Sequence, residues 1–260
     1  MSAPFGTMIA DAYGAVGAYD PDIIYLYSDF RTFGRYLDEF PTRAAFCDAL
    51  VSPLLQRGKT LVMTAFTYTT EGRFDVLSTP TKLGVLNKWI LAQPGVCRSE
   101  HPLFSYAAVG PQAELVLNIG KSAFGHDSVF TRLLGQRAAF LHVGRPVWMG
   151  NTALHHVEHF GGATYRTHKA FRTEVYRGAA FVGSDYSAFL RRMDVPGEAF
   201  TFTFREAANL LFSRGLVKQV GTDADLTNVS LLWYDDTLAE LHQMFRADTT
   251  IFIGSNFIQY

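Results

Sequence analysis

Three side chains that can move protons lie within one helical turn of this chain: His155, Glu158 and His159. On an α-helix these positions fall at i, i+3 and i+4, so the three side chains share one face. Two kinds of chemistry fit this spacing. In the first, His155 is a general base and Glu158 holds its ring in one tautomer. In the second, His155 and His159 bind zinc and Glu158 activates a water molecule, the H-x-x-E-H pattern of a hydrolase.

A helix over residues 152–159, capped by Asn151 or Thr152, must position these side chains. Apolar runs rich in β-branched and aromatic residues predict strands at 22–27, 60–68, 104–109, 138–143, 164–176 (a strand or a hairpin), 199–204 and 249–253. Apolar periodicity predicts helices at 42–58, 81–94, 113–117, 129–134, 205–213 and 236–246. This alternation is typical of an α/β fold with a central mixed β-sheet flanked by helices. No Pro/Ser-rich linker divides the 260 residues, so we expect one domain over 1–260.

Composition excludes several classes of protein. Hydrophobic residues make up 48% and charged residues 18% of the chain, as in an ordinary globular protein. A formal net charge of −1 gives no general attraction to nucleic acid or to an anionic membrane, and no apolar run is long enough to span a bilayer. The first 17 residues do not have the pattern of a signal peptide, so we expect a cytoplasmic protein. The glycine-rich loops that cradle nucleotide phosphates and the G-x-S-x-G elbow of hydrolases are absent.

A second polar segment runs from Arg98 through Ser99, His101 and Ser105 to Gly110. Because His101 precedes a proline, it is held extended at the start of a predicted strand, where a ligand could approach. The alternative is that Arg98, His101 and Ser105 only form hydrogen bonds with loop backbone.

Two ordered motifs give these residues a context. His101-Pro102-x-x-Ser105-x-Ala107-Ala108-x-Gly110, followed by Thr152-x-Leu154-His155-x-x-Glu158, resembles the aminoglycoside 3-N-acetyltransferase family. Shorter segments match in the same order: Tyr25 to Phe30, Thr60 to Met63, Pro80 to Gly84 and Pro94 to Ser99. The resemblance covers about residues 22–165, and it implies a catalytic core there and a substrate-shaping portion over about 166–260.

The resemblance implies acetyl-coenzyme A as the acyl donor, no metal, and direct transfer to an amine. His155 would be the general base and Glu158 its orienting partner, while the Thr152 hydroxyl could steady the thioester or an oxyanion. The segments that border the pantetheine arm in the family correspond here to Ser28, Asp29, Phe30, Ser99, His101 and Ser105. One departure is that the family's H-S before S/D-L is Tyr27-Ser28 in this chain.

The acceptor is predicted from the segment after the helix. Arg166, His168 and Arg172 recur with period two, so one strand would carry them on one face. That face is either solvated or a cradle for phosphate, which would be the phosphates of the coenzyme or the diphosphate of a nucleotide-linked sugar. Arg166 and Arg172 are therefore candidate substrate-binding residues. We therefore expect a small-molecule amino sugar, nucleotide-linked in one version, of the kind built into surface polysaccharides. The alternatives are an aminoglycoside acceptor, zinc hydrolysis and a non-catalytic sugar-binding relative, and a homodimer stays open.

Overall fold

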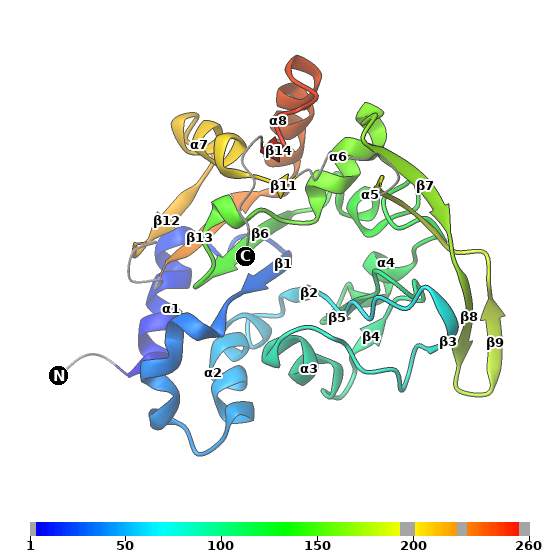
Figure 1. Ribbon diagram of the computed structural model, residues 1–260. Helices are drawn as coiled ribbons and strands as arrows, with labels where there is room; N and C mark the ends of the chain where they lie inside the picture. The colour runs from blue at the N-terminus through cyan, green and yellow to red at the C-terminus, as the bar shows by residue number, and fades with distance from the viewer. Residues whose placement is uncertain (1–3, 193–200, 223–227, 255–260) are drawn as a thin grey trace.

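A seven-stranded sheet forms the centre of the computed structural model, which describes residues 4–192, 201–222 and 228–254 (Figure 1). In spatial order its strands are β12 (Lys218–Val220), β13 (Val229–Trp233), β6 (Ala138–Val143), β1 (Ile23–Ser28), β2 (Thr60–Thr64), β5 (Tyr106–Val109) and β4 (Cys97–Arg98). Strand β1 pairs in parallel with β2 and β6, and the other neighbours are antiparallel. The predicted α/β class with a central mixed sheet is confirmed.

The strands at the centre of the sheet are apolar on both faces because both faces are covered. All six residues of β6 are buried, and so are the first five of β1. Alternate side chains enter different cores: Tyr25 belongs to one hydrophobic cluster and Ile24 to the other.

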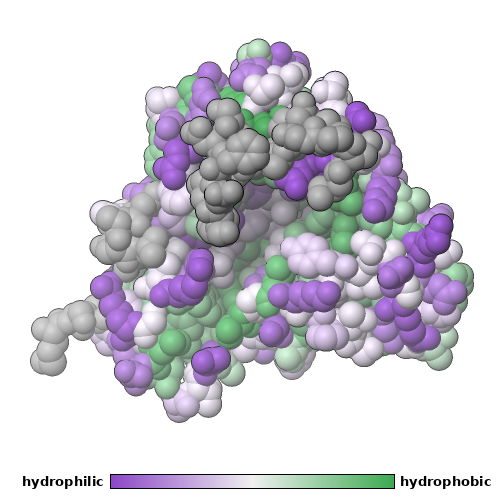
Figure 2. All heavy atoms as spheres, viewed as in Figure 1, coloured by the Kyte–Doolittle hydropathy of each residue, from purple (hydrophilic) through white to green (hydrophobic). Residues whose placement is uncertain are grey.

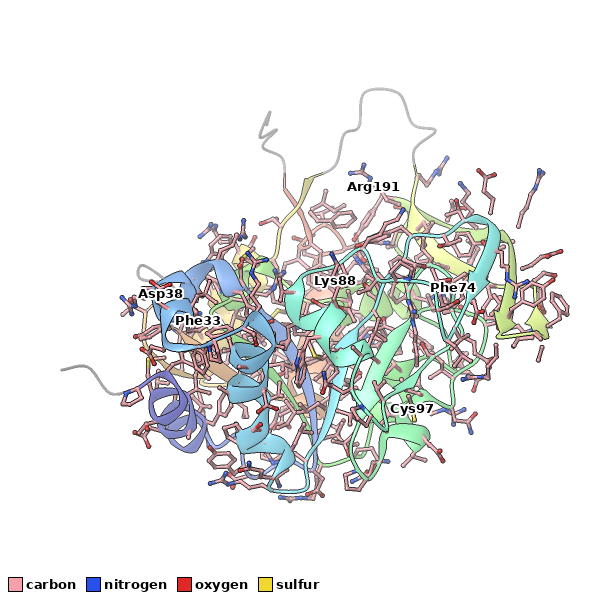
Figure 3. The ribbon with its side chains drawn as sticks, turned by 90° about the horizontal axis from the view of Figure 1, so that it is seen from below. Phe33, Asp38, Phe74, Lys88, Cys97 and Arg191 are labelled. Atoms are coloured by element: carbon pink, nitrogen blue, oxygen red, sulfur yellow. The ribbon has the colours of Figure 1, made fainter. Side chains whose placement is uncertain are left out.

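Helices from the first part of the chain cover the Ile24 face. They are α1 (Phe5–Val16), the 3-10 helix η1 (Phe30–Glu39), α2 (Arg43–Leu55) and α3 (Val85–Leu91). Phe33 of η1 is fully buried in this layer, with its ring 5.5 Å from that of Phe5 (Figure 3). The Tyr25 face is covered by α4 (Ala113–Leu117), α5 (Val129–Leu133), the 3-10 helix η2 (Val147–Met149), α6 (Ala153–Gly161), α7 (Arg205–Ser213) and α8 (Tyr234–Ala247).

Three small sheets lie outside the central one. They are β3 (Glu71–Asp75) with β8 (Arg172–Arg177) and β9 (Ala180–Gly183), β7 (Arg166–Ala170) with β10 (Ser187–Arg191), and β11 (Thr201–Phe202) with β14 (Ile253–Gly254).

The prediction that Arg166, His168 and Arg172 share one strand face is wrong. The chain changes partners at Phe171, which is buried and donates its N–H to the carbonyl of Tyr186, while the next N–H goes to the carbonyl of Thr70. Arg166 and His168 therefore lie on β7, and Arg172 lies on β8 in another sheet.

Other differences from the sequence prediction have local causes. Helix α3 begins at Val85 rather than near Thr81, because the Thr81 hydroxyl donates to the carbonyl of Phe66. The strand expected at 249–253 is only Ile253–Gly254, because the Asp248 side chain turns the chain by accepting the N–H of Thr250. Of the predicted segment 199–204, residues 199 and 200 lie outside the described residues. Helix α1, the 3-10 helices η1 and η2, and strands β3, β4, β9, β10, β12 and β13 were not predicted.

The C-terminal part of the chain completes the central sheet. Strand β13 pairs with all but the first residue of β6, and β12 extends the sheet beyond it. The two portions expected from the sequence, about 22–165 and 166–260, thus share one sheet. Within the described ranges, the helices lack the length and apolar character needed to cross a membrane.

Candidate active site

Helix α6 starts just beyond the carboxyl ends of β6 and β1. The Asn151 side chain accepts the N–H of Ala153 at 3.0 Å, while Thr152, at the N-cap position, makes no capping bond. Gly162 ends the helix in the left-handed conformation, with φ 69°. The face of the molecule that is turned to the viewer in Figure 2 is hollowed near its centre, in the region where Figure 1 places β1 and β6. Helix α6 thus carries its first turn to the edge where parallel strands end, a usual place for ligands.

His155 and Glu158 meet as their spacing predicted. His155 Nδ1 lies 2.8 Å from Glu158 Oε2. The His155 side chain is 21% exposed and that of Glu158 is 0% exposed. When Nδ1–H donates to the carboxylate, the lone pair of Nε2 is left to accept a proton. The arrangement is that of an oriented imidazole with a buried acid behind it.

Arg166, the first residue of β7, and Tyr165 just before it fix the Glu158 carboxylate. The Tyr165 hydroxyl donates to Oε1 at 2.9 Å, and Arg166 Nε lies 2.7 Å from Oε2. The Arg166 side chain is only 3% exposed, and its Nη1 donates to the carbonyl of Phe189 at 3.0 Å. Arg166 was predicted to bind substrate, but its guanidinium is already engaged by protein groups. Arg172 remains exposed on β8.

The surroundings of His155 keep its ring neutral. Burial, the largest effect, lowers the pKa of His155, and the positive charge of Arg166 lowers it further. The hydrogen bond to Glu158 raises the pKa but does not reverse the shift. A neutral imidazole is the form that can accept a proton.

Two tyrosines hold the Thr152 side chain. Its Oγ1 lies 3.0 Å from the hydroxyl of Tyr25 and 3.0 Å from that of Tyr27, and its N–H donates to the Tyr27 hydroxyl at 3.2 Å. Burial raises the pKa of Tyr27 to about 12, so this hydroxyl keeps its proton. The Thr152 hydroxyl, which does not cap the helix, is oriented by these contacts beside the turn that carries His155.

The turn after β1 brings Ser28, Asp29 and Phe30 to the same sheet edge. Asp29 Oδ1 accepts the N–H of Arg31 and so caps η1. The carboxylate also pairs with the Arg31 guanidinium at 2.5 Å, which holds the pKa of Asp29 below its usual value. Phe30 packs on Phe46, with ring centroids 5.0 Å apart. Ser28 is partly exposed.

Ser99, His101 and Ser105 are not placed as ligand contacts, because all three are buried and bonded to backbone. Ser99 Oγ accepts the N–H of Tyr106, and Ser105 Oγ donates to the carbonyl of Ala65. His101 Nδ1 accepts two backbone N–H groups, and its Nε2–H donates to the carbonyl of Ser187 at 3.0 Å. These contacts correspond to the structural alternative stated for this segment, so the three residues are corrected to backbone anchors.

The other histidines of α6 have separate surroundings. His156 Nδ1 lies 3.0 Å from the carbonyl of Phe124, and burial lowers the pKa of His156 to about 4. The His159 ring packs against His168 and Phe189, at 5.1 and 5.5 Å. In the described part of the chain, no three His, Cys, Asp or Glu side chains form a metal-binding group. Glu158 itself is committed to His155, Tyr165 and Arg166.

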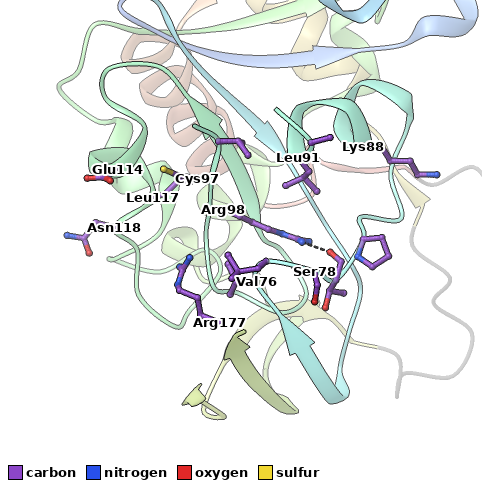
Figure 4. A pocket seen from close by; sticks show the side chains of 15 residues that line it. Val76, Ser78, Lys88, Leu91, Cys97, Arg98, Glu114, Leu117, Asn118 and Arg177 are labelled. Carbon is purple, nitrogen blue, oxygen red and sulfur yellow. Dashed lines mark hydrogen bonds between the residues drawn. The ribbon is translucent and has the colours of Figure 1, made fainter. Parts of the chain in front are cut away.

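A cavity of about 590 Å³ lies by the edge strand β4, on residues other than those of α6 (Figure 4). Its lining includes Lys88, Cys97, Arg98 and Arg177; Lys88 and Cys97 are also seen in Figure 3. Arg98 spans its wall, donating to the carbonyls of Ala65 and Thr79. The cavity is separate from the site around His155.

Comparisons with known proteins identify a family and a fold. The chain matches the aminoglycoside 3-N-acetyltransferase family over residues 27–180. It resembles three solved structures: aminoglycoside acetyltransferase AAC(3)-IVa (22% identity, 95% of this chain and 90% of that chain, TM-score 0.72), AAC-VIa bound to sisomicin (18%, 94% and 98%, 0.73) and YokD from Bacillus subtilis (15%, 99% and 97%, 0.73). No curated protein sequence matches the chain.

Proposed function

The chain belongs to the aminoglycoside 3-N-acetyltransferase family, and from this premise we propose that it acetylates an amine of an aminoglycoside with His155 as general base. It is an acetyl-coenzyme A-dependent N-acetyltransferase, as the members of this family are. The observation that carries the proposal is the partly exposed His155 ring, 2.8 Å from the buried Glu158 carboxylate.

An aminoglycoside acceptor fits better than the nucleotide-linked amino sugar expected from the sequence. The family is that of the aminoglycoside enzymes, and one similar structure is AAC-VIa bound to sisomicin. The nucleotide-linked version needed cationic side chains aligned as a phosphate cradle. That alignment is lost, since Arg166 pairs with Glu158 and Arg172 lies in another sheet.

His155 supplies the step that acyl transfer to an amine requires. An amine is protonated at neutral pH and becomes a nucleophile only when it loses a proton. In our proposal His155 Nε2 accepts that proton, and Glu158 stabilises the resulting imidazolium through Nδ1–H. A positioned base of this kind contributes about 10²–10⁴ in rate.

Thr152 is proposed to bind a substrate oxygen. Both tyrosine hydroxyls can donate to its Oγ1, at 3.0 Å each, which leaves its own proton free to point away from them. A donor aimed at an oxygen that gains charge in the transition state stabilises that charge.

Coenzyme A, when bound, supplies an acetyl group activated as a thioester. Ser28 is partly exposed at the carboxyl end of β1, and Arg31 beside it has a side chain that is 83% exposed. A hydroxyl and a cation at this edge fit the polar arm and the phosphates of the coenzyme. We propose that Ser28, Asp29 and Phe30 border the coenzyme, with Asp29 acting by holding Arg31.

The test compares His155→Ala and Glu158→Gln with the native enzyme. Free thiol released from acetyl-coenzyme A is measured with sisomicin, apramycin, simple amino sugars and nucleotide-linked amino sugars. We expect turnover with aminoglycosides, a loss of at least about 10²-fold in His155→Ala, and a smaller loss in Glu158→Gln. Native-like circular dichroism would show that His155→Ala is folded.

Three results would contradict the proposal. Activity of His155→Ala within a few-fold of native would show that His155 is not the general base. Turnover with nucleotide-linked amino sugars, and with no aminoglycoside, would favour the nucleotide-linked acceptor expected from the sequence. Sugar binding without thiol release would indicate a non-catalytic relative.

A further inference from the structure

Arg166 contacts both members of the proposed catalytic pair. Its Nε lies 2.7 Å from Glu158 Oε2, and its Nη2 lies 2.7 Å from His155 Nδ1. The third nitrogen, Nη1, donates to the carbonyl of Phe189 on β10, and the Phe202 ring covers the guanidinium at 4.8 Å. Arg166 is thus fixed from three sides, and its charge cannot move away from His155.

His155 Nδ1 cannot satisfy both neighbours in the same way. It lies 2.8 Å from a carboxylate oxygen, which requires Nδ1–H as donor, and 2.7 Å from a guanidinium nitrogen, which can only donate. Nδ1–H on Glu158 leaves Nε2 basic, whereas Nδ1 accepting from Arg166 places the proton on Nε2. The proton on Nδ1 is therefore attracted by Glu158 and opposed by Arg166.

We propose that Arg166 is a positioning residue that clamps the Glu158 carboxylate and limits the basicity of His155, so that the imidazole is unprotonated when the acceptor amine binds. This inference rests on the proposed role of His155 as base. Without a nearby cation, a fully buried carboxylate 2.8 Å away would hold the imidazolium and leave no vacant site for a proton. Arg166 also pairs with this carboxylate, so its positive charge offsets part of the attraction between Glu158 and a protonated His155.

Within residues 4–192, 201–222 and 228–254, the charged and titratable groups around His155 come from α6 and from the start of β7. Glu158 lies on its own helix, and Tyr165 and Arg166 come from the start of β7 and the residue before it. Among the described residues, the other rings in contact with His155 are those of Phe124 and Phe202, which are apolar, at 5.2 and 5.8 Å. The direction of the His155 pKa, lowered by burial and by Arg166, agrees with this arrangement.

The experiment measures the titration of the His155 ring itself, by NMR of protein with isotope-labelled histidine. His155→Gln identifies the signal by its loss. Arg166→Met removes the charge with similar length, and Arg166→Lys keeps a charge but not the planar fork. We expect the His155 pKa to rise by about one unit or more in Arg166→Met and to stay near the native value in Arg166→Lys. The acidic limb of kcat/KM should move to higher pH by the same amount in Arg166→Met.

A second pair of variants keeps the test valid if Arg166→Met fails to fold, since that change leaves Glu158 buried without its cation. Glu158→Gln and the double variant Glu158→Gln/Arg166→Met both contain a neutral residue 158. Loss of Arg166 should raise the His155 pKa in this background too. An unchanged pKa in either comparison would overturn the inference.

The inference and the proposed function fail separately. If His155→Ala stays active, the proposed role of His155 as general base is wrong, whatever the NMR titration shows. If His155→Ala is inactive but Arg166→Met leaves both the His155 titration and the acidic limb unmoved, only the role of Arg166 is lost. A purely structural Arg166 would lower stability without moving either pH readout.

Discussion

At the residue scale, the site is built around the buried Glu158 carboxylate, which lies within 3 Å of polar atoms of His155, Tyr165 and Arg166. Glu158 is fully buried and receives bonds on both carboxylate oxygens, so it can orient His155 but cannot turn to the substrate. His155 is the more exposed of the two, which is the order that a base and its supporting acid require.

The Thr152 contacts lead to a prediction at this scale. Thr152→Val removes the hydroxyl but keeps the shape, and kcat should fall by about 10²-fold while the KM for coenzyme changes little. Thr152→Ser should retain activity within a few-fold. Tyr27→Phe, which removes the acceptor of the Thr152 N–H and one neighbour of Oγ1, should cost about tenfold.

Steady-state kinetics of the purified variants check this prediction. Tyr19→Phe is a matched control, because the Tyr19 hydroxyl donates to the carbonyl of Ala10 on α1, away from the site. It should leave kcat unchanged. Full activity in Thr152→Val would show that its hydroxyl has no part in the transfer.

At the scale of elements, helix α6 is held between the sheet and α8. Ala153 and Val157 pack into the larger hydrophobic cluster, which also contains Leu241 and Phe245 of α8. Gly161, the last residue of α6, lies against the Phe245 ring, and a Cβ there would meet Cδ1 at 2.4 Å. The close approach of the two helices depends on this missing side chain.

Gly161→Ala should therefore destabilise the protein by about 1–3 kcal/mol, because buried Phe245 cannot yield without moving α8. Urea denaturation measures the change. Gly6→Ala on α1 is the control, since a Cβ there meets nothing within 4 Å and alanine favours helix. It should be neutral or stabilising by up to about 1 kcal/mol. Equal stability of Gly161→Ala and native protein would mean that α6 and α8 can separate freely.

At the scale of the whole molecule, three buried histidines link stability to pH. Burial lowers the pKa of His101 to about 4, of His142 to about 3 and of His156 to about 4. A histidine in the unfolded chain has a pKa near 6.5. Below this pH these three histidines are protonated in the unfolded chain but stay neutral in the folded protein. Stability should fall as the pH decreases from about 6.5 towards 4, by up to about 2 kcal/mol per histidine at pH 5.

His142 offers the sharpest test of this pH dependence. It lies on β6 at 0% exposure, and burial is the largest cause of its low pKa. His142→Leu should change the free energy of unfolding little at pH 7 and raise it by up to about 2 kcal/mol relative to native at pH 5. Urea denaturation at both pH values measures the difference. Parallel pH profiles of the two proteins would contradict the prediction.

The sequence by itself determined the features that depend on neighbours along the chain. The i, i+3 spacing placed His155 and Glu158 on one helical face, and the apolar runs of β1 and β6 marked the strands beside them. The family resemblance, too, came from two ordered motifs and is confirmed by the family match.

Only the tertiary structure decided which distant groups meet. Arg166 faces the buried Glu158 from the first position of β7, whereas Arg172 lies in another sheet because the chain changes partners at Phe171. A period-two pattern cannot reveal where a strand changes its partner. His101 and Ser105 carry the residue types of a binding site, but the fold buries them and uses their polar atoms for backbone groups. Burial and long-range pairing are properties of the packed chain, so the assignment of each polar side chain to ligand or to backbone had to come from the structure.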